Sequence, residues 1–123
     1  MTPDRRAELD RAYRDTDYRA ALRVDAPALI DADSWAFLTA CNPMSETLPD
    51  EENAARTEAL RRDLAAYRVV DGEAASPDGT WREASFLVLE ITLDDARALA
   101  VKHRQAAFLF GERGQPARLV WTV

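Results

Sequence analysis

Six polar residues in the middle of the chain are of types that bind small anions or move protons. They are Asn42, Ser45, Asn53, Arg56, Glu83 and Ser85. A guanidinium offers a planar fork of donors to a carboxylate or phosphate, and amide, hydroxyl and helix-start N–H groups can complete such a cradle. The pattern therefore predicts a polar cleft that binds a small anionic ligand, such as a nucleotide, a sugar phosphate or a carboxylate.

The same residue types also have local structural uses. Asn42 followed by Pro43 is typical of an Asx turn, and Ser45 can bind the amides of its own loop. Glu52 lies one helical turn before Arg56 and can pair with it. Because such uses are routine, the sequence leaves the structural and the ligand-binding interpretations open.

Glu83 and Ser85 are two residues apart in an expected strand, so their side chains point to the same side. If Glu83 approaches Arg56, it can orient the guanidinium or act as a general acid or base. Ser85 has no base or nucleophile-elbow pattern near it in the sequence. A small enzyme that uses Glu83 is therefore an alternative to a binding protein, and the sequence does not decide whether the protein is an enzyme.

Metal and redox chemistry have little support. The chain has one histidine, His103, and one cysteine, Cys41. A zinc centre needs several such ligands, so we expect no metal and no cofactor. His103 continues an apolar helical stripe and Cys41 ends an apolar run, which indicates structural roles for both. A single cysteine excludes an intrachain disulfide and suits a reducing cytoplasm.

The hydrophobic pattern from Trp35 onward predicts the order strand, helix, strand, strand, helix, strand. We expect strands at 35–41, 68–73, 84–91 and 106–110, and helices at 49–67 and 93–103 with Thr92 as a cap. Before them the spacing predicts a helix at 3–14 and a strand from Tyr18 to Val24. After them, residues 118–122 close a hairpin across the turn 111–116.

This order is the split β-α-β arrangement of ferredoxin-like folds. The prediction is one α+β domain over residues 1–123, in which helices pack on a mixed or antiparallel sheet. The N-terminal helix and strand and the C-terminal hairpin strand extend or cover that sheet. A mixed α+β sheet with another strand order is the alternative.

The overall charge excludes some partners. With 22 acidic and 16 basic residues the formal charge is -6, which repels nucleic-acid phosphates and anionic lipids. The sequence also has no apolar run of the length of a signal peptide core or a membrane span. We therefore expect a cytoplasmic protein without nucleic-acid or membrane partners.

Several short motifs occur in a fixed order. They are Trp35-Ala36-Phe37-Leu38-Thr39-Ala40, Asn42-Pro43-x-Ser45, Glu52-Asn53-x-x-Arg56 and Glu83-x-Ser85-Phe86. As an ordered set they resemble an uncharacterised bacterial family of small domains of unknown function. The resemblance runs from Tyr13-x-x-Thr16-x-Tyr18, through Trp81 and Gln105, to Gly111. It implies a single domain but no substrate, reaction or cofactor.

A protein-interaction or regulatory module without a small-molecule site is the rival interpretation from another functional class. The aromatic residues exceed what one thin sheet face needs, so the N-terminal helix or a second copy of the chain must cover some of them. We favour the helix, and homodimerisation through the sheet is the alternative.

Overall fold

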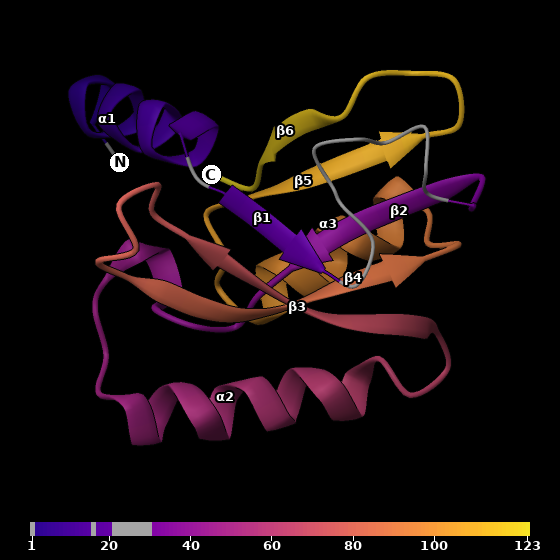
Figure 1. Cartoon of the computed structure of the whole chain (residues 1–123), viewed down its shortest axis with the longest axis horizontal. Helices are drawn as coiled ribbons and strands as arrows, with labels where there is room; N and C mark the ends of the chain where they lie inside the picture. Colours follow the sequence, from indigo (N-terminus) through magenta and orange to yellow (C-terminus); the bar gives the residue numbers. More distant parts are fainter. Residues whose placement is uncertain (1, 16, 21–30) are drawn as a thin grey trace.

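The computed structural model describes residues 2–15, 17–20 and 31–123. These residues form an α+β domain of helices packed on an antiparallel sheet (Figure 1). The elements in chain order are α1 (Pro3–Asp15), β1 (Asp17–Ala20), β2 (Ser34–Leu38), the 3-10 turn η2 (Pro43–Ser45), α2 (Asp50–Asp63), β3 (Arg68–Ala75), β4 (Arg82–Leu89), α3 (Leu93–Lys102), β5 (Ala107–Glu112) and β6 (Arg118–Trp121).

The described strands form one sheet in the order β1-β3-β4-β2-β5-β6. Each neighbouring pair is antiparallel. The hairpin of β3 and β4 is the longest ladder, with Arg68 opposite Leu89 at one end and Ala75 opposite Arg82 at the other. Strands β4 and β2 lie at the centre of the sheet; Glu83 and Ser85 belong to β4, and Asn42 and Ser45 lie in the loop after β2.

One face of the sheet carries the main core, against α2 and α3. Its buried strand residues alternate along the chain, as a strand with two distinct faces requires. Leu60 of α2, Leu64 directly after it, and Ala96 and Ala100 of α3 pack against the sheet. The sheet residues that they meet are Ala36, Leu38, Phe86, Val88, Phe108 and Phe110. Leu60 and Leu64 lie one helical turn apart, and this side of the helical segment is therefore buried.

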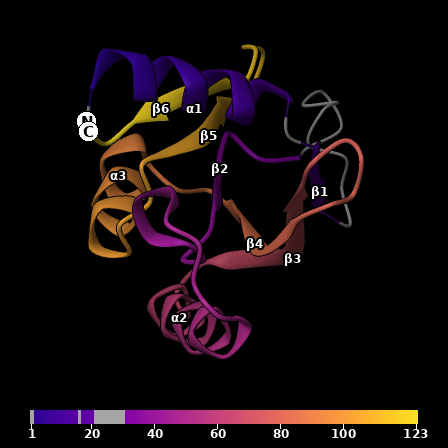
Figure 2. The same ribbon diagram turned by 90° about the vertical axis from the view of Figure 1, so that its left-hand side faces the viewer.

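The other face of the sheet carries a second cluster that includes Trp35, Phe37, Leu87 and Leu89. Tyr18 of β1 meets Phe37 edge to face, with 5.4 Å between ring centroids. Helix α1 lies beside β5 and β6, and the sheet separates it from α2 (Figure 2). It therefore helps to cover the aromatic residues that α2 and α3 do not reach.

Helix α1 contacts Trp121 of β6 with two side chains. The ring of Tyr13 meets Trp121 edge to face at 5.9 Å, and the Arg6 guanidinium lies 4.7 Å from the centroid of the Trp121 ring. Leu9 is buried from the same helix. These contacts hold the helix against the sheet with its inner side facing the site.

Two strands end earlier than the hydrophobic pattern predicts. The strand expected at 35–41 stops at Leu38, because the Thr39 hydroxyl donates to the carbonyl of Ala84 at 2.8 Å and the chain then turns. The strand expected at 84–91 covers 82–89, because Glu90 has a φ of 55°, which a strand cannot contain. The hydrophobic pattern continues past the ends of both strands, so it does not show where the strands stop.

Other boundaries differ by a few residues. The strand expected at 68–73 continues to Ala75, and the helix expected at 49–67 ends at Asp63. The last expected strand of the core runs to Glu112, so the start of the expected turn at 111–116 is in fact paired. The part of the expected N-terminal strand beyond Ala20 lies outside the described residues.

Candidate functional site

A cavity of about 320 Å³ lies between α1, the loop after β2 and the sheet. Much of its wall is apolar, with Leu9 from α1, Phe37 from β2, Ala74 from β3 and Phe108 from β5. Asn42, Ser45, Glu83 and Ser85 add polar groups from the loop and from β4. Four of the six residues singled out in the sequence therefore line one cavity.

The loop after β2 presents Asn42 and Ser45 through an unusual backbone. Asn42, Met44 and Ser45 have positive φ angles of 49°, 52° and 64°. Asn tolerates this left-handed region better than most residues, which suits it to begin the turn. The Met44 N–H donates to the carbonyl of Arg104 at 2.7 Å, and this bond holds the loop against the end of α3.

Hydrogen bonds hold both polar atoms of the Asn42 side chain in place. Its Oδ1 accepts from the Leu48 N–H and from Asn53 Nδ2, both at 2.9 Å. The backbone N–H of Asn42 donates to Asn53 Oδ1 at 2.9 Å. Because a backbone N–H can only donate, the Leu48 bond settles which side-chain atom is oxygen, so Asn42 Nδ2 must face Glu83.

Glu83 lies in the β3–β4 ladder opposite Ala74, and Ser85 follows opposite Gly72. Asn42 Nδ2 donates to Glu83 Oε2 at 2.8 Å. Ser85 is 2% exposed, and its hydroxyl donates to the Glu83 carbonyl at 3.2 Å. Both side chains line the cavity, as their shared strand face predicts.

Burial raises the pKa of the Glu83 carboxyl above its ordinary value of 4.5, and the hydrogen bond from Asn42 only partly offsets this. Desolvation disfavours the ionised form of a carboxyl, whereas an N–H donor favours it. Glu83 is therefore a carboxyl that faces a cavity and titrates above the usual range.

Tyr13 belongs to the same site, although the sequence indicates only an inward-facing helical residue. Burial, the largest cause, raises the pKa of its phenol, the Glu83 charge raises it further, and hydrogen bonds from Ser45 and the Ala107 backbone lower it. Tyr18 Oη donates to the Tyr13 carbonyl at 2.9 Å. The available signal is Tyr13-x-x-Thr16-x-Tyr18, which belongs to the ordered set of motifs.

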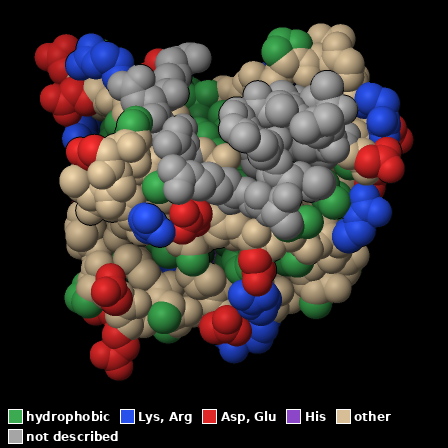
Figure 3. Space-filling view, in the orientation of Figure 1, with side chains coloured by type: hydrophobic (Ala, Val, Ile, Leu, Met, Phe, Trp, Pro, Cys, Tyr) green, Lys and Arg blue, Asp and Glu red, His purple; other side chains and the backbone are tan. Residues whose placement is uncertain are grey.

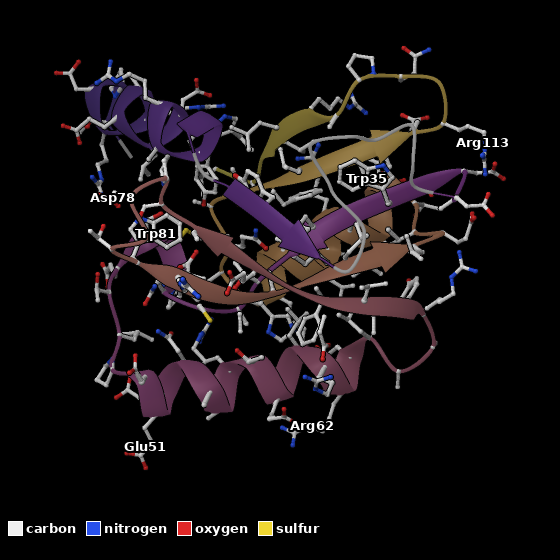
Figure 4. The ribbon with its side chains drawn as sticks, in the orientation of Figure 1. Trp35, Glu51, Arg62, Asp78, Trp81 and Arg113 are labelled. Carbon is white, nitrogen blue, oxygen red and sulfur yellow. The ribbon has the colours of Figure 1, made fainter. Side chains whose placement is uncertain are left out.

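Trp81 and Gln105 also line the cavity. Trp81 stands at the turn between β3 and β4, on the side of the molecule where α1 lies, and is 41% exposed (Figure 4). Gln105 is 8% exposed, and its Oε1 accepts from the Thr39 N–H at 3.0 Å. Both occur in the set of resembling motifs, but only the folded chain brings them to one place.

The structure holds Asn53 and Arg56 away from the cavity wall formed by the described residues. Asn53 is engaged with Asn42 and donates to the Leu48 carbonyl at 3.3 Å. Arg56 Nε donates to the carbonyl of Ala40, and Arg56 Nη2 donates to that of His103, both at 2.7 Å. These are structural contacts of the kind that the alternative interpretation expects, though with backbone carbonyls rather than Glu52.

His103 and Cys41 are both largely buried, and Cys41 also lines the cavity. His103 is 8% exposed at the end of α3, with Nε2 2.7 Å from Asp63 Oδ2. Lys102 and His103 hold the pKa of the Asp63 carboxyl below its usual range. The Cys41 thiol lies 3.5 Å from the Thr57 hydroxyl, and the residue is 8% exposed.

Within residues 2–15, 17–20 and 31–123, no three His, Cys, Asp or Glu side chains are placed to share a metal ion. In the same residues no helix has the length and apolar character needed to cross a bilayer. On the face shown in Figure 3, acidic and basic side chains are interspersed and do not gather into one basic surface.

Comparison with known proteins gives one match. A family model described as a protein of unknown function (DUF3293) matches residues 38–108, which include the loop, α2, β3, β4 and α3. Searches of curated proteins and of solved structures found no match. The matched region is more than half of the chain and contains all six polar residues singled out in the sequence, so the chain belongs to the DUF3293 family.

Proposed function

We propose that the protein binds a small molecule in the cavity between α1 and the sheet. The observation that carries the proposal is the convergence of Asn42, Ser45, Glu83 and Ser85 on one largely apolar cavity of about 320 Å³. Small-molecule sites are usually concave, mostly apolar and supplied with a few placed polar groups, and this volume lies within their range.

The sequence-based expectation of an anionic ligand depends on Arg56, whose guanidinium donates to two backbone carbonyls. Arg5 of α1 lines the cavity and is the remaining basic group in its described wall. Its Nη1 pairs with Glu8 Oε2 at 3.2 Å on the surface. Glu83 repels an anion when ionised, so an anionic ligand requires a protonated Glu83. The geometry favours a neutral or cationic ligand instead.

A variant that fills the cavity tests the proposal. Ala12 and Ala7 are both exposed residues of α1, but only Ala12 belongs to the described wall of the cavity. Ala12→Phe should occupy the space that a ligand needs, and Ala7→Phe makes the same change in composition elsewhere. Both variants keep a residue that an α-helix accepts.

The measurement is a thermal-shift screen of nucleosides, nucleotides, sugar phosphates, carboxylates and amines against wild type, Ala12→Phe and Ala7→Phe. A ligand at about one hundred times its Kd adds about 2.7 kcal/mol, which raises the Tm of a domain this size by several degrees. We expect a compound to stabilise wild type and Ala7→Phe but not Ala12→Phe. Equal shifts in all three proteins, or none, would contradict binding in this cavity.

Catalysis with Glu83 as acid or base is a second candidate. Its support is a partly buried carboxyl with a raised pKa beside a cavity that can hold a substrate. Conversion of a bound compound by wild type but not by Glu83→Gln, followed by NMR, would favour this candidate over binding alone.

The interaction-module alternative has less support. The exposed large apolar residues among those described are Trp81, Val101 and Val123, which come from a hairpin turn, from α3 and from the last residue. Single exposed apolar side chains are normal on soluble domains. A homodimer remains an alternative whose test is the molar mass in solution by light scattering.

We also propose a ferredoxin-like topology for β2 to β5 with α2 and α3. The sheet order β3-β4-β2-β5, with antiparallel neighbours, supports it. The formal charge of -6 repels phosphates and supports the proposal that nucleic acid is not a general partner. The buried free thiol of Cys41 supports a reducing, cytoplasmic setting.

A further inference from the structure

The carboxyl of Glu83 has an incomplete set of partners, and this bears on the chemistry of the ligand. Asn42 Nδ2 donates to Oε2, but Oε1 has no hydrogen-bond partner among the described residues. A carboxylate accepts several hydrogen bonds, so one oxygen is left for a group that enters the cavity. The Asn42 amide cannot rotate to serve both oxygens, because Leu48 and Asn53 hold its Oδ1.

No positively charged side chain in the described part of the cavity wall forms an ion pair with Glu83. Arg5 is 51% exposed at its side chain and is paired with Glu8, and no cation contributes to the pKa of Glu83. A carboxylate that is partly shielded from water and accepts one side-chain hydrogen bond gains from a cation that brings its own N–H donors. Among the described residues, none pairs a positive charge with Glu83, and a ligand can supply that charge.

The rest of the wall suits the body of such a ligand. Five aromatic residues line the cavity: Tyr13, Tyr18, Phe37, Trp81 and Phe108. Ring faces attract cations, and they also stack with planar groups. A ligand with a flat aromatic body and a cationic end can stack on the aromatic side chains and bind the Glu83 carboxyl at the same time.

We propose that the ligand of this cavity carries an amidinium or protonated amine on an aromatic body, with its N–H groups on Glu83. This inference rests on the proposed binding function and makes its ligand class specific. An anion, the opposite class, would meet the Glu83 carboxylate at the same place, and that carboxylate repels it when ionised.

Three probes of nearly one shape separate the ligand classes: benzamidine is a cation, benzamide is neutral and benzoate is an anion. Each is titrated by calorimetry at about pH 8, where benzamidine is charged, into wild type, Glu83→Gln and Ala12→Phe. Gln keeps an oxygen for Asn42 Nδ2, so Glu83→Gln removes the charge without removing that contact. Thermal melts check that each variant is folded.

We expect benzamidine to bind wild type at least about tenfold more tightly than benzamide, as one charge-assisted contact predicts. That preference should vanish in Glu83→Gln, and Ala12→Phe should bind neither probe. If benzamide or benzoate binds wild type as well as benzamidine and Ala12→Phe abolishes that binding, the cavity binds ligands but the cation class is wrong. Binding of none of the three to wild type also overturns the cation class, and binding unaffected by Ala12→Phe overturns the cavity itself.

Discussion

Arg56 ties three parts of the chain together through one side chain. From α2, its guanidinium donates to the carbonyl of Ala40 after β2 and to that of His103 at the end of α3. Both carbonyls belong to buried residues. Buried carbonyls that lose their donors cost free energy, so the side chain stabilises the junction under the candidate site.

Replacing Arg56 should therefore destabilise the fold more than it affects ligand contacts. Arg56→Ala should lower the free energy of unfolding by about 2 to 4 kcal/mol, and Arg56→Lys by about half as much, since each lost bond leaves a carbonyl unpaired. Urea denaturation measures this. Arg62 points away from the sheet on the same helix (Figure 4), so Arg62→Ala should change stability by less than about 0.5 kcal/mol. Equal effects of the two alanines would refute the assignment.

Gly111 is required by the ring of Trp35. A Cβ placed at Gly111 would lie 2.2 Å from Cε2 of that ring, which is too close for two carbon atoms. Gly111→Ala should cost about 1 to 3 kcal/mol, the usual range for overpacking. The change is measured by thermal or urea unfolding.

Gly114 provides the control for that substitution. It has a φ of 78° and open space at its Cβ position, so Asn, which accepts positive φ, should be tolerated there.

A double variant tests whether the Trp35 ring is the cause. Combining Gly111→Ala with Trp35→Phe should cost less stability than the sum of the two single changes, because the two residues are in contact. Simple additivity would show that the ring is not the cause.

Residue-scale prediction works where a side chain acts through its sequence neighbours. Asn42, Ser45, Glu83 and Ser85 were recognisable from turn and strand patterns, and they line the cavity. Arg56 was expected to face the same cleft, but which carbonyls surround a guanidinium depends on how three separate segments pack.

At the scale of elements, α3 shows a complete N-terminal cap. The Thr92 hydroxyl accepts from the Asp95 N–H at 3.1 Å, and Asp94 and Asp95 occupy the first turn. Such a cap satisfies a backbone donor that the helix leaves free, and acidic residues there favour the helix dipole. The role of Thr92 was predictable because capping is a local property.

Thr92→Ala should lower the free energy of unfolding by about 1 kcal/mol, because it removes the oxygen that accepts the Asp95 N–H. Thr92→Ser keeps that oxygen and should stay close to wild type. Chemical denaturation of the three proteins decides the matter, and an equally destabilised serine variant would mean that the methyl group matters instead of the cap.

The existence and type of the core elements followed from hydrophobic periodicity, but their ends did not. Strand β2 stops at Leu38 because the Thr39 hydroxyl donates to the Ala84 carbonyl and the Thr39 N–H donates to Gln105 Oε1 instead of to the ladder. Strand β4 stops at Leu89 because Glu90 turns into positive φ. Neither event changes the hydrophobic pattern, so a pattern cannot locate it.

At the scale of the whole molecule, Glu83 links folding to pH. Burial raises the pKa of its carboxyl in the folded protein, so the protonated form is favoured there. Its favourable contribution is fully present below the ordinary pKa of 4.5 and is lost as the pH rises through the raised pKa. Asp63 has the opposite sign, because its lowered pKa stabilises the fold above 3.8 and this is lost on acidification.

The variant Glu83→Gln isolates the pH-dependent contribution of the Glu83 carboxyl to stability. It keeps the contact with Asn42 and has no charge to desolvate, while Asp63 is unchanged and cancels in the comparison. The variant should gain stability relative to wild type as the pH rises from about 4.5 to about 8. Calorimetric Tm values across this range provide the measurement, and parallel curves for the two proteins would contradict the buried carboxyl.

The position of Trp81 gives the molecule an optical reporter. The chain has three tryptophans, of which Trp35 is 2% exposed, Trp121 is half-buried under Arg6, and Trp81 is 41% exposed at the cavity. Indole emission moves to shorter wavelength when water leaves the ring, so filling the cavity should shift the protein's intrinsic fluorescence to the blue. The same ligand should leave the emission of Trp81→Phe unchanged, and binding can then be followed without any label.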